Sequence, residues 1–109
     1  MTFKEYQELA RRTQNDRIMM HQKELHALHG LASEVGEIHA HYQKVYQGHV
    51  LKYDKIIDEI GDVLWFMAEL ADSMGVSMDE IAQHNIDKLR KRYPDGFDVE
   101  HSVHREEFV

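Results

Sequence analysis

The sequence predicts an all-α protein arranged like a four-helix bundle, and three observations support this class. Apolar residues recur at the three- and four-residue spacing of amphipathic helices through most of the chain. The single proline, Pro94, lies near the C-terminal end, and the six glycines are scattered. No segment shows the strict alternation of a half-buried strand. Four helices joined by short connections are typical of an antiparallel bundle. The helices are expected over residues 2–13, 18–47, 54–74 and 77–92.

The first two helices have recognisable ends. Thr2 followed three residues later by Glu5 has the spacing of a capping box, which predicts the start of the first helix. The second and longest helix carries an apolar stripe that runs from Leu25 to Val45. Gly48 suits its C-terminal end, because glycine readily adopts the left-handed conformation found there.

The last two helices are predicted by the same signals. An apolar stripe that begins at Ile56 defines the third helix, which is expected to end at Gly75. Ser77 and Glu80 form a second capping box at the start of the fourth helix. The tail, 94–109, has no clear period and is expected to be extended or to lie over a neighbouring element.

Composition limits the classes to which the protein can belong. A chain of 109 residues is expected to form one domain, 1–109, with a modest core. Its formal net charge is −7, and it lacks the broad basic face of duplex-binding proteins, so no nucleic-acid partner is expected. No apolar run approaches the roughly 18 residues of a membrane-spanning helix, so no membrane association is expected. The chain contains no cysteine, and a cytoplasmic location is the simplest expectation.

Two pairs of carboxylates in the central helices are the most informative pattern. Glu34 and Glu37 lie three residues apart in the second helix, and Glu59 and Asp62 have the same spacing in the third. Residues three apart are neighbours on a helix surface, so each pair projects to one side. If the two helices pack side by side, four carboxylates converge. Oxygen ligands of this kind suit Mg²⁺ or Mn²⁺.

Spacing alone leaves a metal site and a solvated face equally open. The chain has 20 acidic residues, so pairs three apart also arise by chance, and we expect Glu5/Glu8 and Glu69/Asp72 to solvate an outer face. A di-iron site is disfavoured because no Glu is followed three residues later by His. The alternative from another functional class is a non-catalytic helical nucleotide-binding or protein-interaction module.

Three segments, in order, resemble the MazG-like nucleotide pyrophosphohydrolases. They are LHGLASEVGEI (28–38), DEIGDVLWFMAELA (58–71) and IAQHNIDKLRKRYPDGF (81–97). The family hallmark is two carboxylates three apart, a spacer and then Glu-x-x-Asp, which Glu34, Glu37, Glu59 and Asp62 match. The resemblance implies that these four residues are catalytic and hold Mg²⁺, with Mn²⁺ as a substitute.

The same resemblance implies a substrate and an assembly. Members of the family are all-α, usually homo-oligomeric, and hydrolyse NTPs or dNTPs to the monophosphate and pyrophosphate. Asn85 and Lys88 match the family's Asn-x-x-Lys positions and would contact phosphate oxygens, with Arg92 as a further donor. The alternative for this segment is a basic last turn that complements the helix dipole. A homodimer or homotetramer, with the active site near the subunit interface, and a role in clearing unwanted nucleotides are expected.

Three ring-bearing residues carry separate interpretations. Trp65 faces away from the apolar stripe of its helix and is expected first at a subunit interface, with cover over the nucleobase or packing under the tail within one subunit as alternatives. Phe66 follows Asp62 by one turn, and core packing is favoured over a wall of the base pocket. His41 is expected to be a partly exposed polar residue, and contact with the metal ligands is its alternative.

Overall fold

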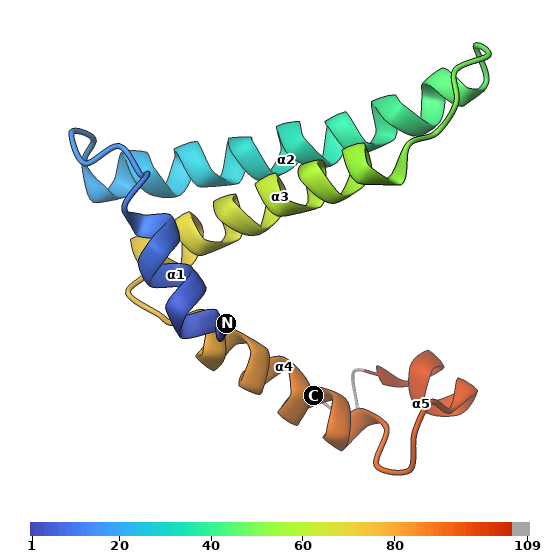
Figure 1. Ribbon diagram of the computed structural model, residues 1–109. Helices are drawn as coiled ribbons and strands as arrows, with labels where there is room; N and C mark the ends of the chain where they lie inside the picture. Colours follow the sequence, from blue (N-terminus) through green and yellow to red (C-terminus); the bar gives the residue numbers. More distant parts are fainter. Residues whose placement is uncertain (106–109) are drawn as a thin grey trace.

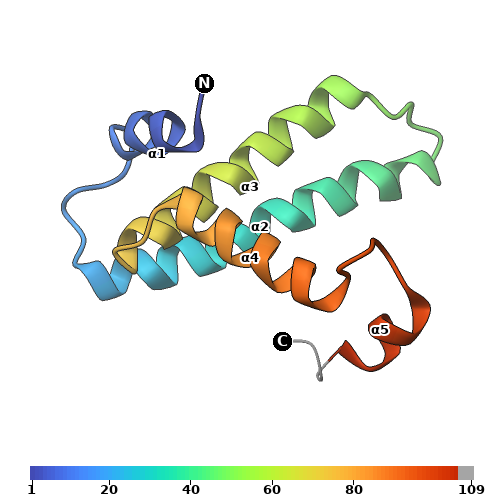
Figure 2. The same cartoon turned by 90° about the horizontal axis from the view of Figure 1, so that it is seen from below.

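The computed structural model describes residues 1–105, and all regular elements in that range are helices (Figure 1). They are α1 (Phe3–Arg11), α2 (Met20–Val45), α3 (Tyr53–Ser73), α4 (Met78–Arg92) and α5 (Val99–Val103). The all-α prediction is confirmed, and the bounds of the first four helices agree with the predicted ones to within two residues. Helices α2 and α3 pack along each other as a long hairpin, and α1 crosses one end of it (Figures 1 and 2).

Local sequence determines where the helices begin and end. The Thr2 hydroxyl accepts a hydrogen bond from the backbone N–H of Glu5 at 3.1 Å, and the Ser77 hydroxyl accepts one from Glu80 N–H at 3.0 Å. Both predicted caps are therefore present, and each stabilises its helix by about 1 kcal/mol. Gly75 ends α3 with a φ of 69°, a conformation that glycine adopts without steric cost.

Helices α2 and α3 approach closely where Gly30 of α2 faces the ring of Phe66 of α3. A Cβ atom added to Gly30 would lie 2.2 Å from Cε1 of Phe66, far inside van der Waals contact. Ala27, one turn away on α2, is fully buried. Small residues on α2 thus let α3 approach closely, and Phe66 packs half-buried against α2, while its place in a base pocket stays a prediction.

The hydrophobic core lies where α1, α3 and α4 meet, and Trp65 belongs to it. Its buried members are Ala10, Ala68, Ala71 and Met78, with Tyr6, Leu64, Trp65 and Val76 packed against them. The indole Nε1–H of Trp65 donates a hydrogen bond to the Thr13 hydroxyl at 2.8 Å. Trp65 is therefore half-buried within its own chain, and its place at a subunit interface stays a prediction. The intrachain packing arises because α1 covers the side of α3 that faces away from its apolar stripe.

The expectation that Glu69 and Asp72 solvate an outer face is wrong. Glu69 is fully buried, with 0% of its surface exposed, and its Oε1 lies 2.5 Å from Nδ1 of His26 on α2. Asp72 forms an ion pair with Arg11 of α1, with 2.8 Å between Oδ1 and Nη2. These carboxylates connect α3 to the two helices beside it, so the acidic side of α3 is an interior side at this end.

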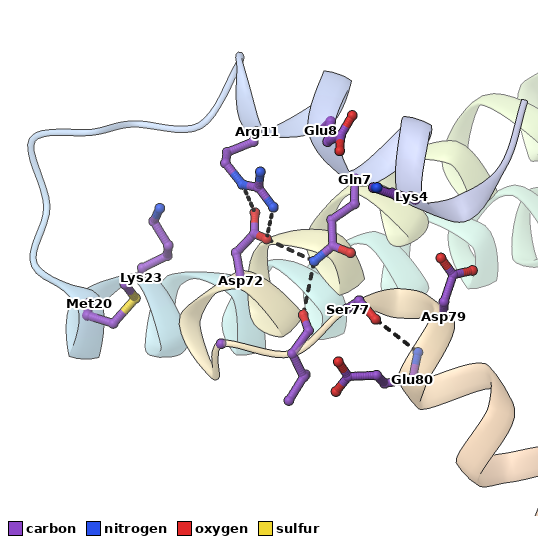
Figure 3. Close-up of a pocket in the computed structure, with 12 residues that line it drawn as sticks. Lys4, Gln7, Glu8, Arg11, Met20, Lys23, Asp72, Ser77, Asp79 and Glu80 are labelled. Atoms are coloured by element: carbon purple, nitrogen blue, oxygen red, sulfur yellow. Dashed lines mark hydrogen bonds and ion pairs between the residues drawn. The ribbon is translucent and has the colours of Figure 1, made fainter.

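A buried glutamine joins α1 to the connection between α3 and α4 (Figure 3). Only 4% of the Gln7 surface is exposed. Its Nε2 donates to Asp72 Oδ1 at 2.8 Å and to the Val76 carbonyl at 3.1 Å, and its Oε1 accepts from Met78 N–H at 2.9 Å. The three bonds satisfy every heavy atom of the amide group and hold the first residue of α4 against α1.

Helix α4 then leads away from the hairpin, so one chain does not close a four-helix bundle (Figure 1). The predicted extended tail, 94–109, is partly helical, because Asp98 accepts a hydrogen bond from His101 N–H at 3.0 Å and begins the short helix α5. The rest of that tail, 106–109, lies outside the described residues. No helix in the described range has both the length and the apolar character needed to cross a bilayer.

Candidate metal centre

Three carboxylates converge between α2 and α3. One oxygen each from Glu34, Glu59 and Asp62 lies within 4.8 Å of the others. Glu34 and Glu59 are half-buried, and Asp62 is exposed. The close contact described above sets this convergence, because Gly30 lies one turn before Glu34 and Phe66 one turn after Asp62.

The cluster concentrates negative charge that a cation would offset. Partial burial raises the pKa of Glu34 above its ordinary value. A hydrogen bond with Glu59 and the negative charges of Asp62, Glu59 and Glu37 raise it further. The donor atoms are all carboxylate oxygens, which is the ligand chemistry that Mg²⁺ and Mn²⁺ prefer. The residues present therefore fit a hard divalent cation.

Glu37, the fourth predicted ligand, lies beside the cluster and not within it. Its side chain is exposed on α2, one turn after Glu34. Its charge nevertheless contributes to the raised pKa of Glu34, so its carboxylate is close enough to act on the cluster electrostatically. The structure thus brings together three of the four predicted carboxylates and leaves Glu37 at the edge.

Two further side chains adjoin the carboxylates. Nε2 of His41 lies 3.5 Å from Oε1 of Glu59, at the outer limit of a hydrogen bond, and 28% of the histidine side chain is exposed. His41 is thus the partly exposed polar residue expected first, and it also contacts Glu59, one of the candidate ligands. Tyr6 of α1 was missed by sequence reasoning. Burial raises the pKa of Tyr6, and the negative charge of Asp62 raises it further. The only feature of the sequence that pointed to Tyr6 was its hydroxyl group on the apolar stripe of the first helix.

The predicted phosphate ligands lie on α4, which leads away from the hairpin (Figures 1 and 2). Asn85 lines an apolar cavity of about 300 Å³ between α1, α3 and α4. Lys88 is half-buried, and the Arg92 guanidinium lies over the ring of Tyr93, with 5.9 Å between its Cζ and the ring centroid. Their contact with phosphate remains a prediction.

The fold and the cluster together place this chain among all-α proteins in which carboxylates of two adjacent helices form a site suited to a divalent cation. The family follows from the sequence of the same region, because residues 22–97 match the model of the MazG nucleotide pyrophosphohydrolase domain. The chain therefore belongs to the MazG nucleotide pyrophosphohydrolase family. The match includes all four predicted carboxylates and the three predicted phosphate ligands.

One curated relative comes from a phage. The chain is similar to the Gene 37 protein of Mycobacterium phage L5, with 33% identity over 72 residues, which cover 62% of this chain and 63% of the relative. The match thus spans less than two thirds of the relative's length. No solved structure gives a significant match to the chain.

Proposed function

We propose that this protein hydrolyses nucleoside triphosphates, ribo- or deoxyribo-, to the monophosphate and pyrophosphate in a Mg²⁺-dependent reaction. The observation that carries the proposal is the convergence of Glu34, Glu59 and Asp62 within the MazG domain. The family supplies the reaction class, and the all-oxygen donor set supports Mg²⁺, with Mn²⁺ as a substitute. The cellular role is the removal of unwanted nucleotides, in the cytoplasm.

The residues of the chain have distinct tasks in this reaction. A divalent cation, when bound, supplies charge neutralisation and activation of the attacking water. Glu34, Glu59 and Asp62 hold it, and His41 steadies the Glu59 carboxylate from the side. Glu37 is exposed and free to turn toward the cluster once a cation offsets the repulsion between the carboxylates, so it completes the catalytic set.

The active assembly is a homodimer or homotetramer. We expect α4 of another subunit to bring Asn85, Lys88 and Arg92 to the phosphates, because α4 leads away from the hairpin of its own chain (Figure 1). Exposed large apolar residues support association. On α3 alone, Ile57 is 67% exposed and Ile60 is 53% exposed. Burial of such side chains stabilises by about 25 cal/mol per Å² of apolar surface removed from water.

The test is the release of pyrophosphate from a panel of NTPs and dNTPs, with Mg²⁺, with Mn²⁺ and with EDTA. We expect release of monophosphate and pyrophosphate that requires the metal, and the ranking of bases identifies the preferred substrate. Absence of turnover on every nucleotide, with circular dichroism showing a folded protein, would contradict the proposal. That result would favour a helical nucleotide-binding or protein-interaction module.

A further inference from the structure

A small cationic cavity lies at the end of the hairpin where α2 passes into α3. Its volume is about 220 Å³. The residues that line it are His41, Lys44, His49, Val50, Leu51, Lys52 and Lys55. Three lysines and two histidines thus line one space, and among residues 1–105 no carboxylate lines it. We refer to this space as the basic cavity.

The charge of the basic cavity is unusual for this chain. The protein has 20 acidic and 13 basic residues, so three lysines around one space run against its net charge of −7. Within residues 1–105, none of the ion pairs involves Lys44, Lys52 or Lys55. Like charges around one space repel each other, and an anion placed between them relieves that repulsion.

The start of α3 adds to the positive potential. Lys52 is the residue before the first turn, and no side chain caps that turn. Backbone N–H groups at the start of a helix lack intrahelical partners, and the positive end of the helix dipole lies there. Asp54, the acidic residue of the first turn, does not line the cavity.

The basic cavity adjoins the carboxylate cluster. His41 lines the cavity, and its Nε2 lies 3.5 Å from Oε1 of Glu59. Lys55 precedes Glu59 by four residues on α3, so the two side chains lie one turn apart on the same side of the helix, about 6 Å along its axis. A cation-binding cluster and a cationic cavity therefore lie side by side along the hairpin.

We propose that the basic cavity binds the terminal phosphates of a polyphosphate substrate and the pyrophosphate product released from it. A triphosphate spans this arrangement when its inner phosphate lies at the carboxylate cluster and its outer phosphates lie among Lys44, Lys52 and Lys55. The identity of the substrate rests on the proposed function. The affinity of the cavity for pyrophosphate does not.

The first test measures binding of inorganic pyrophosphate by isothermal titration calorimetry, in EDTA and without nucleotide. The test variant is Lys44→Gln/Lys52→Gln/Lys55→Gln, in which all three replaced side chains are exposed. The matched control is Arg12→Gln/Arg17→Gln/Lys91→Gln, which removes three exposed cations elsewhere and has the same net charge. We expect the wild type and the control to bind equally, and the test variant to bind at least about tenfold more weakly, because charge-assisted contacts are lost.

Equal binding by all three proteins, or no binding by the wild type, overturns the assignment. Circular dichroism establishes that each variant is folded. A nucleoside monophosphate provides a second comparison, because it lacks terminal phosphates. Its affinity is expected to be the same for the test variant and the control, and a parallel loss for the monophosphate would overturn the assignment to terminal phosphates.

Turnover separates this inference from the proposed function. If nucleotides are hydrolysed, the test variant should show a raised KM for the triphosphate. Hydrolysis with an unchanged KM and unchanged pyrophosphate binding would overturn the basic cavity and leave the proposed function intact. Lysine-dependent pyrophosphate binding in a protein that hydrolyses no nucleotide supports the cavity as an anion site and overturns the proposed function.

Discussion

Replacement of Gly30 by alanine should separate α2 from α3 next to the carboxylate cluster. The added Cβ would lie 2.2 Å from Cε1 and 2.3 Å from Cδ1 of Phe66. The ring has little room to move, because Trp65 meets it edge-on at a centroid separation of 5.0 Å and His26 lies 5.6 Å away. Relief of the clash therefore requires the helices to shift or several rings to repack.

The expected change in the free energy of unfolding of Gly30→Ala is the difference of two terms. Overpacking of a core contact costs about 1–3 kcal/mol. Alanine in a helix interior recovers about 1 kcal/mol relative to glycine. We therefore expect Gly30→Ala to lower the free energy of unfolding by about 1 kcal/mol, within a range of about 0–2 kcal/mol. At Gly36 an added Cβ meets nothing within 4 Å, so Gly36→Ala should stabilise by about 0.5–1 kcal/mol.

Urea unfolding followed by circular dichroism, at one protein concentration because association contributes to stability, measures both variants. The difference between Gly30→Ala and Gly36→Ala is the informative quantity, since both changes add the same methyl group to the same helix. A second substitution, Phe66→Leu, should recover part of the loss in Gly30→Ala by making room for the methyl group. If Gly30→Ala proves as stable as Gly36→Ala, the close approach of the helices does not restrict the side chain at position 30.

Three other predictions concern the cluster, the α1–α3 contact and the core. Glu59→Gln should abolish Mg²⁺-dependent turnover and the rise in melting temperature on addition of Mg²⁺, while circular dichroism stays unchanged. Full activity in this variant would contradict the metal centre. Burial opposes ionisation of Asp72, but hydrogen bonds from Arg11, Gln14 and Gln7 together hold its pKa below the ordinary 3.8. Its contribution to stability is therefore complete well above pH 3.8 and is lost as the pH falls through the lower folded value. The stability of Asp72→Asn should therefore lack that contribution in acid unfolding. An identical pH dependence of stability in the wild type and in Asp72→Asn would contradict the stabilising role of this carboxylate. Thr13→Val removes the acceptor of the Trp65 indole and should cost about 1 kcal/mol in urea unfolding. Sedimentation should show an unchanged association state, and a shift to monomer would place Trp65 at the subunit interface.

Features that depend on short stretches of sequence were predictable. Thr2 and Ser77 cap their helices through residues three positions away, and the same short spacing placed Glu59 and Asp62 on one side of α3. The convergence of these two with Glu34 required only that α2 and α3 pack together, which a single chain reversal near Gly48 achieves.

Features that depend on contacts between separate elements were not predictable. Glu69, Asp72 and Trp65 lie on sides of α3 that the helical period marks as outer, and they are interior because other elements cover them. The sequence does not distinguish the exposed Glu37 from the half-buried Glu34, since both lie in the same local pattern. No fixed sequence spacing identifies the lysines of the basic cavity, because they come from both sides of a chain reversal.

The hydrogen bonds of Gln7 determine where the far end of α4 lies. Apolar side chains slide over one another at little cost, whereas a hydrogen bond weakens steeply when its angle changes. The amide of Gln7 thus orients the first turn of α4 at Met78. At 1.5 Å per residue, Arg92 lies about 21 Å further along the axis, so a tilt of about 10° at Met78 moves Arg92 by about 4 Å. A single glutamine that is not a member of the carboxylate cluster therefore determines how far the cationic end of α4 reaches.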